Sequence, residues 1–283
     1  MWWDMAYERL GEGALNYYQC QYGASKLVFR GPKKKLSNRF VATIGGTETY
    51  GKFVELPYPA MLEDLLDLPV ANFGCVNAGI DAYLGDQTIL ENCKKASATI
   101  LQVGGVQNLS NRFYSVHARR NDRFIKASPL LTSIYPGLDL TDVHFTGHLL
   151  TVLQRTSPLD FQVICQDLKE TWVARMQALI DCIDSPVVLL WMADHAPGEN
   201  PEERPLGHDP MFVERWMLDE LQPDVAAYVE INASRQEIAA GFERMIFGPL
   251  EAPAAEEMLG PIVHEVAARK LQTVMGALLT SGP

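Results

Sequence analysis

A hydroxyl group that follows an apolar run is the first candidate for chemistry in this sequence. Gly45, Gly46 and Thr47 come directly after residues 40–44, and a tight turn there would expose the Thr47 hydroxyl. A hydroxyl is a weak nucleophile until a base removes its proton. Thr47 therefore indicates acyl transfer, provided that a base and donors for the developing negative charge lie nearby.

The same turn has a second interpretation as a phosphate loop. Residues 46–52 read GTETYGK and satisfy the pattern GxxxxGK, whose backbone amides can cradle a phosphate. Phe53 stands where Ser or Thr would hold magnesium, and Pro57 and Pro59 interrupt the helix that such a loop needs. The phosphate loop is therefore the weaker hypothesis, and a glycine-rich turn without chemistry is the third.

An asparagine after another apolar run is the candidate donor. Gly105 to Asn108 reads GVQN and follows residues 99–103. An amide side chain can donate to a developing negative charge without titrating, and such a donor contributes about 3 kcal/mol to transition-state stabilisation. The alternative is that Asn108 caps a helix or a turn.

The general base must come from the histidines. Six are present: His117, His144, His148, His195, His208 and His264. His264 opens the last helical pattern and is our first candidate. Asp194 and His195 follow the apolar run at residues 187–192 and form the alternative base. A structural histidine, hydrogen-bonded or solvated, is the other interpretation of either residue.

A basic cluster stands out in an otherwise acidic chain. Arg112, Arg119, Arg120 and Arg123 gather among aromatic residues. Guanidinium groups pair with carboxylates or sulfates, and the aromatic faces suit sugar rings, so the cluster predicts an anion-binding or substrate-binding clamp. Ordinary surface salt bridges with the surplus acids are the competing interpretation, and a nucleic-acid role is weaker still.

Short apolar runs alternate with helical patterns along the chain. The expected strands are residues 40–44, 70–73, 99–103, 187–192 and 225–231. The expected helices are residues 61–68, 89–98, 159–183, 211–221, 235–246 and 262–279. This alternation predicts an α/β fold with parallel strands and helices on both faces of the sheet. Ligands of such sheets bind at the carboxyl ends of the strands, where the candidate residues lie.

We expect one domain over residues 1–283. Residues 1–36 are irregular and are expected to wrap the core, and residues 112–145 form an insertion between the third and fourth strands. The residues after Met1 are interrupted by Asp4 and Glu8, so no signal peptide is expected. The longest apolar run, residues 187–193, is far shorter than the roughly 20 residues of a membrane-spanning helix.

Charge and cysteine content exclude several classes of partner. The net charge of −11 argues against nucleic acid and an anionic membrane as partners, because phosphates need a positive field. Five cysteines without a CxxC spacing indicate neither a disulfide framework nor a zinc site. We therefore expect a cytoplasmic protein without a bound metal.

Taken together, these motifs resemble the blocks of the SGNH (GDSL-type) hydrolases, over about residues 40–279. The turn GGTETYG resembles the nucleophile block with Thr47 in the serine position. The resemblance implies that the amides of Thr47 and Gly79, with Gly74 as the alternative glycine, and the Asn108 side chain hold the oxyanion. It also implies that His264, followed by Ala267, Ala268 and Leu271, is the base.

The resemblance implies a three-layer α/β/α sandwich with a flavodoxin-like sheet, ester hydrolysis and no cofactor. Two residues depart from the family pattern: Thr47 replaces serine, and Pro261 stands where an aspartate would orient the histidine. We expect an ester hydrolase or acyl transferase acting on a small or carbohydrate-linked acyl ester. The alternative is a catalytically degenerate SGNH-fold protein that binds a glycan or another partner.

Overall fold

A five-stranded parallel sheet forms the centre of the protein. The computed structural model describes residues 15–200 and 204–280. The strands are β1 (Val41–Ile44), β2 (Val70–Asn72), β3 (Ala98–Gln102), β6 (Val187–Ala193) and β7 (Ala227–Asn232). All neighbouring pairs run parallel, and each strand begins and ends within two residues of a predicted apolar run. The predicted strands are confirmed.

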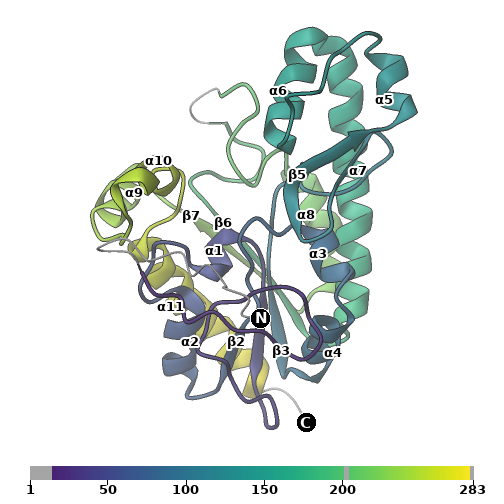
Figure 1. Ribbon diagram of the computed structural model, residues 1–283. Helices are drawn as coiled ribbons and strands as arrows, with labels where there is room; N and C mark the ends of the chain where they lie inside the picture. The colour runs from purple at the N-terminus through teal and green to yellow at the C-terminus, as the bar shows by residue number, and fades with distance from the viewer. Residues whose placement is uncertain (1–14, 201–203, 281–283) are drawn as a thin grey trace, which may run out of the picture.

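Helices cover both faces of this sheet (Figure 1). One face packs against α2 (Tyr58–Leu66), α9 (Arg235–Phe242) and α11 (Pro261–Thr280). The other packs against α3 (Ile80–Leu84), α4 (Gln87–Lys95), α7 (Pro158–Ile183) and α8 (Arg215–Leu221). All seven residues of β6 are buried, and they alternate between the two cores, as expected for a strand covered on both sides. The predicted three-layer α/β/α sandwich is confirmed.

The order of the strands determines where a ligand can bind. The order is β2-β1-β3-β6-β7, which is the flavodoxin-like arrangement. From β1 the chain crosses first to β2 on one side and then returns to β3 on the other side. At such a switch point the two following loops leave in opposite directions and open a crevice at the carboxyl ends. Thr47 and Asn108 lie on these two loops.

The inserted region is more regular than the sequence predicted. It contains an antiparallel hairpin of β4 (Tyr114–His117) and β5 (Arg120–Ala127), followed by α5 (Pro129–Ile134). Burial alternates along β4, and the Ser128 side chain accepts from the Leu131 amide at the start of α5. A further helix that was not predicted, α6 (Thr146–Thr156), packs on α7, and α5 and α6 form a lobe beyond the sheet (Figure 1).

The remaining helices are short. They are α1 (Thr47–Tyr50), η1 (Gln222–Asp224), η2 (Pro249–Glu251) and α10 (Ala252–Ala255). The helix predicted at residues 211–221 begins later, at Arg215, because residues 211–214 belong to an irregular loop. Within residues 15–200 and 204–280, no helix combines the length and the apolar character needed to cross a bilayer.

The predicted wrapping segment lies partly outside the described residues, which begin at residue 15. Its described part packs Tyr22, Leu27 and Phe29 into the core. Arg30 is 8% exposed, and its guanidinium donates to the carbonyl oxygens of Gly51, Val54 and Glu55 at 2.5–2.7 Å. The segment therefore holds the chain that follows α1, and Thr47 is the first residue of α1.

Replacing Arg30 with Met should lower the free energy of unfolding by about 3 kcal/mol, because three carbonyl oxygens would lose a charged donor. Urea denaturation monitored by circular dichroism measures the change. Arg39→Met is the matched control, since Arg39 is exposed and makes one long contact, 3.4 Å to the Leu279 carbonyl. Equal destabilisation by both substitutions would show that Arg30 does not hold this segment.

Candidate functional site

The turn after β1 presents Thr47 at the carboxyl edge of the sheet. α1 is a single helical turn from Thr47, and it ends where Gly51 adopts a left-handed conformation with φ +76°. The Lys52 ammonium lies over the Phe53 ring, 4.5 Å from its centroid. The long helix that a phosphate loop needs is therefore not formed at this turn, so the phosphate-loop hypothesis is wrong.

The Thr47 hydroxyl is held by a chain of polar side chains. It accepts a hydrogen bond from the backbone N–H of Asn77 at 3.2 Å and donates to the side-chain Oδ1 of Asn77 at 3.3 Å. Asn77 Nδ2 in turn donates to Asp122 Oδ2 at 3.0 Å. Asn77 has φ +58°, a conformation that asparagine tolerates better than most residues. The position of the hydroxyl therefore depends on the loop after β2 and on the inserted hairpin.

The Asn108 side chain is oriented by one hydrogen bond. The Thr146 hydroxyl, at the start of α6, donates to Asn108 Oδ1 at 2.8 Å. Because this bond fixes the carbonyl end of the amide, the Nδ2 group is the end that remains for a ligand. Among residues 15–200 and 204–280, no protein acceptor is hydrogen-bonded to Asn108 Nδ2. Asn108 can therefore act as a donor.

The two candidate glycine amides are both occupied. The Gly79 amide donates to Asn121 Oδ1 at 2.7 Å, and the Gly74 amide donates to Asn72 Oδ1 at 2.8 Å. Neither amide is available to an oxyanion in this arrangement. Gly79 has a packing role instead, because a Cβ there would lie 2.1 Å from the Asn108 carbonyl oxygen. The Gly79 amide, which we expected to donate to the oxyanion, donates to Asn121 instead.

His264 is buried next to Glu48, the residue that follows Thr47. Its side chain is fully buried, and its Nδ1 accepts from the Tyr58 amide at 3.1 Å. Its Nε2 lies 3.6 Å from Glu48 Oε2, and Glu48 Oε1 accepts from the Leu259 amide at 3.0 Å. Although Glu48 lies beside Thr47, His264 Nε2 forms no hydrogen bond within the described residues, and His264 does not line the cavity that Thr47 lines.

A second group of titratable residues lies at the carboxyl end of β6. Asp194 Oδ1 accepts from His195 Nδ1 and Asp194 Oδ2 accepts from His208 Nδ1, both at 2.7 Å. His195 lies edge-on against Trp191, outside the cavity, whereas Asp194 and His208 line it. An imidazole that donates from Nδ1 to a carboxylate carries its lone pair on Nε2, which is the tautomer of a general base.

The environment of Asp194 favours its charged form. Burial by itself raises the pKa of this carboxyl, but the hydrogen bonds and charges of His195 and His208 outweigh burial and leave the pKa below its usual value. The three residues each place one potential ligand atom within 4.8 Å of the others, so they could hold a metal ion. The imidazole Nδ1 atoms are hydrogen-bonded to separate carboxylate oxygens, an arrangement that suits proton transfer and that also occurs where imidazole Nε2 binds a metal.

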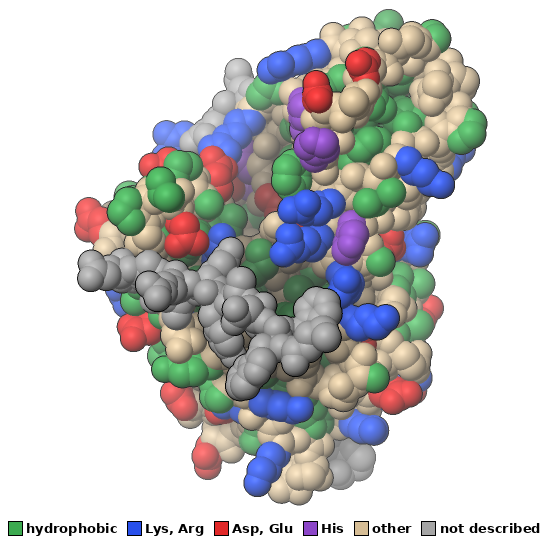
Figure 2. Space-filling view, in the orientation of Figure 1, with side chains coloured by type: hydrophobic (Ala, Val, Ile, Leu, Met, Phe, Trp, Pro, Cys, Tyr) green, Lys and Arg blue, Asp and Glu red, His purple; other side chains and the backbone are tan. Residues whose placement is uncertain are grey.

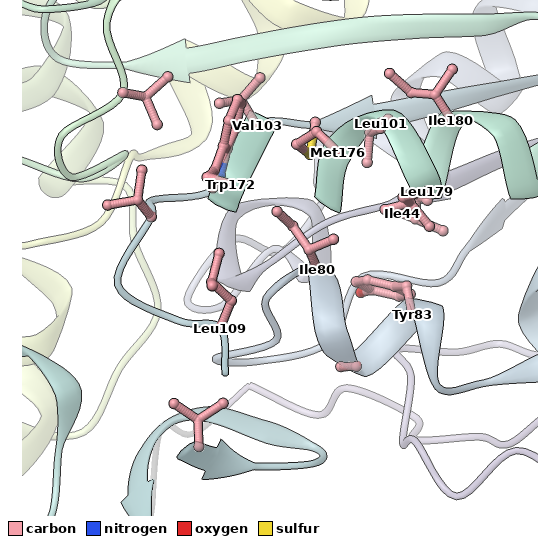
Figure 3. Close-up of a cluster of buried hydrophobic side chains, with 14 of the residues drawn as sticks. Ile44, Ile80, Tyr83, Leu101, Val103, Leu109, Trp172, Met176, Leu179 and Ile180 are labelled. Atoms are coloured by element: carbon pink, nitrogen blue, oxygen red, sulfur yellow. The ribbon is translucent and has the colours of Figure 1, made fainter. Parts of the chain in front are cut away.

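These residues surround one cavity of about 360 Å³. The loops after β1, β2, β3 and β6 each contribute a polar side chain, namely Thr47, Asn77, Asn108 and Asp194. Part of its wall is apolar. Figure 3 shows four of the apolar side chains that line it, Ile80, Leu101, Met176 and Leu179. A hydroxyl, an amide donor and an imidazole–carboxylate pair therefore face one space with an apolar wall, which suits acyl transfer.

The arginines of the basic cluster have different environments. Arg112 forms an ion pair with Asp167 of α7 at 2.6 Å, which is the structural interpretation considered above. Arg119, Arg120 and Arg123 are exposed on the β4–β5 hairpin. Arg112 is therefore engaged within the fold, and a role in binding stays a prediction for the other three.

Sequence reasoning did not assign Asn77, Asp122, Thr146 or His208 to the site. His208 lies in the irregular loop that joins β6 to α8, where no periodicity indicates which side chain turns inward. Asn77, Asp122 and Thr146 join the site through contacts between the hairpin and the strand-end loops. Only one local signal was present for them, the unusual density of Asn and Asp near the predicted loops.

Replacing Gly79 with Ala should destabilise the protein by about 1–3 kcal/mol, because the new Cβ would overlap the Asn108 carbonyl oxygen. Gly104→Ala is the control on the neighbouring loop, since a Cβ there meets no described atom within 4 Å. Thermal and urea unfolding measure both variants. If Gly79→Ala were as stable as Gly104→Ala, the two loops would not be in close contact.

Two comparisons with known proteins find matches to this chain, and a third finds none. No curated protein matches it. The crystal structure of the lipase Lip_vut3 from a goat rumen metagenome is similar at 12% identity and a TM-score of 0.33, covering 80% of this chain and 100% of its own. A family model described as "Domain of unknown function (DUF6473)" matches residues 5–279. Because that match spans nearly the whole sequence, the chain belongs to the family DUF6473.

Proposed function

We propose that this protein is an ester hydrolase or acyl transferase of the SGNH type, acting on a small or carbohydrate-linked acyl ester. One observation carries the proposal: the Thr47 hydroxyl, the Asn108 amide and the Asp194–His208 pair line the same cavity. These are the three functional groups that acyl transfer from a hydroxyl requires. Thr47 and Asn108 follow the two strands of the switch point, where ligands of such folds bind, and Asp194 follows the neighbouring β6.

The proposed reaction begins with attack of Thr47 Oγ1 on the ester carbonyl carbon while His208 Nε2 takes the hydroxyl proton. Asp194 stabilises the resulting imidazolium, and the Thr47 amide and Asn108 Nδ2 donate to the oxyanion. The tetrahedral intermediate collapses, the alcohol leaves with the proton from His208, and the acyl group remains on Thr47. Water, or an acceptor hydroxyl in a transferase, then attacks the acyl group with His208 again as the base.

The choice of base differs from the sequence-based hypothesis. His264 was expected to act on Thr47, but its two ring nitrogens are directed at the Tyr58 amide and at Glu48. His208 shares the cavity with Thr47 and has a carboxylate on Nδ1. We therefore assign the base to His208 and a packing role beside Tyr58 and Glu48 to His264.

The charges of the cavity favour an uncharged acyl group. Five carboxylates line it, those of Glu48, Asp194, Asp209, Glu256 and Glu257, and Arg204 supplies the guanidinium, paired with Glu257 at 2.9 Å. An anionic acyl group would be repelled by this surface. A short neutral acyl group such as acetyl fits both the charge and the apolar wall.

A non-catalytic role in binding is the second candidate, and the occupied Gly79 amide favours it. An oxyanion would find one donor fewer than the family pattern implies. The β-methyl of Thr47 also restricts rotation about χ1 and crowds a tetrahedral centre, which slows attack. The two candidates differ in what they predict for variants of Thr47.

Thr47→Ala should lower kcat/KM for 4-nitrophenyl acetate by at least about 1,000-fold, because the nucleophile is removed. Thr47→Ser should be at least as fast as the parent, since the hydroxyl remains and the β-methyl is lost. The rate of nitrophenol release measures both variants. Thr156→Ala, an exposed hydroxyl on α6, is the control.

A Thr47→Ala protein that hydrolyses the ester as fast as the parent would eliminate Thr47 as the nucleophile. A parent protein without activity on any aryl ester, together with an inactive Thr47→Ser variant, would favour the binding role instead.

His208→Gly should lose about 100- to 10,000-fold in rate, because proton transfer to a positioned base contributes that much. Added imidazole should restore part of the rate, since the substitution leaves room for it in the cavity beside Asp194. His264→Gly, which opens the same space at a side chain outside the cavity, should recover no rate on addition of imidazole. Rescue of the His264 variant and not of the His208 variant would reverse our assignment of the base.

A further inference from the structure

The β4–β5 hairpin carries four exposed cations that form no ion pair. They are Arg119, Arg120, Arg123 and Lys126. Within the described ranges 15–200 and 204–280, none of the four lies within salt-bridge distance of a carboxylate, although the chain has 35 acidic and 24 basic residues. By contrast, the preceding Arg112 pairs with Asp167. Unpaired cations close in sequence repel one another, so the folded protein keeps this arrangement at a cost.

The hairpin also holds these side chains in defined positions. His117 Nδ1 accepts from the amides of Arg119 and Arg120 at 3.3 and 3.2 Å, which fixes the turn. The Arg123 guanidinium lies over the Phe145 ring, 5.5 Å from its centroid, and Phe145 is 46% exposed. Figure 2 shows Lys and Arg side chains gathered in the middle of this face, with histidines beside them. The basic surface is therefore partly preorganised, which lowers the entropic cost of binding.

The basic surface is continuous with the cavity wall. Asp122, between Arg120 and Arg123, accepts from Asn77, which lines the cavity and bonds the Thr47 hydroxyl. Burial raises the pKa of Asp122, while Arg123 and Arg120 act on it in the opposite direction. Arg120 and Arg123 therefore flank in sequence a carboxylate that is two hydrogen bonds from the candidate nucleophile.

We propose that the hairpin, through Arg119, Arg120 and Arg123, binds the carboxylate or sulfate groups of an anionic carbohydrate whose neutral O-acyl ester enters the cavity. This inference rests on the proposed function and names its substrate class. Guanidinium groups match carboxylates and sulfates in bidentate geometry. The acidic cavity takes the uncharged acyl group, and the basic hairpin takes the charged part of the chain that carries it.

The local size of the basic surface favours a short carbohydrate segment over other polyanions. Four cations within residues 119–126 can contact a few anionic groups, and the chain as a whole carries a charge of −11. A nucleic acid duplex or an anionic membrane presents charge over a much wider area, and the acidic remainder of the surface would repel it.

Isothermal titration calorimetry on the full chain tests the proposal. The probes are oligogalacturonate and a sulfated oligosaccharide, with a neutral oligosaccharide of equal length for comparison. Measurements in Thr47→Ala prevent turnover. We expect both anionic probes to bind and the neutral one not to bind. Arg120→Gln/Arg123→Gln should weaken anion binding at least about tenfold and should reduce the slope of log K against log salt by about 2, because two cations are removed.

Lys94→Gln/Lys95→Gln is the matched control, because it removes the same charge from exposed positions at the end of α4. It should bind as the parent does. Equal binding by the hairpin variant and the control, or equal binding of the neutral probe, would overturn the proposal. Preference for single-stranded nucleic acid or for vesicles containing phosphatidylserine would overturn the carbohydrate assignment.

The binding test and the hydrolysis test can fail separately. Anion binding that depends on the hairpin, in a protein without esterase activity, would contradict the proposed function and leave the anion site in place. Hydrolysis of aryl acetates that depends on Thr47, without any anion binding, would contradict the site and leave the esterase in place.

Discussion

The hydrogen bond from the Gly79 amide to Asn121 Oδ1 joins the inserted hairpin to the strand-end loops, and the rest of the site depends on this junction. Gly79 lacks a Cβ, so its loop can lie against the Asn108 carbonyl oxygen. With the hairpin held in this way, Asp122 accepts a hydrogen bond from Asn77. Thr146, at the start of α6, donates to Asn108. The insertion is therefore a structural part of the site, and the sheet alone would not orient the candidate nucleophile or the candidate donor.

The parallel sheet explains why residues distant in sequence meet. Parallel strands bring all their carboxyl ends to one edge, and the switch point between β1 and β3 opens a crevice there. Thr47 and Asn108 follow those two strands, and Asp194 follows the neighbouring β6. The residues of β6 are buried on both faces, so both helical layers pack against the strand that carries Asp194 at its end.

The sheet and most long helices could be predicted because their apolar runs have a clear period and are bounded by glycine, proline or polar loops. The helix α6 was missed although Leu149, Leu150 and Leu153 recur at helical spacing and are buried, and its packing on α7 could not be predicted because the two helices are joined by no local pattern. Thr47 and Asn108 were accessible to prediction since they directly follow strands. His208 was not, because it comes from a loop whose path is set by the Asp194 carboxylate and by contacts with the loop after β3.

The central claim is that an activated Thr47 hydroxyl and the Asn108 amide act on the same carbonyl group. A crystal structure of the protein after reaction with an alkyl fluorophosphonate, a mimic of the tetrahedral intermediate, tests it most directly. The account predicts phosphorus bonded to Thr47 Oγ1, with the phosphoryl oxygen about 3 Å from Asn108 Nδ2. Inactivated protein whose Thr47 is unmodified, or an adduct whose phosphoryl oxygen points away from Asn108, would contradict the account.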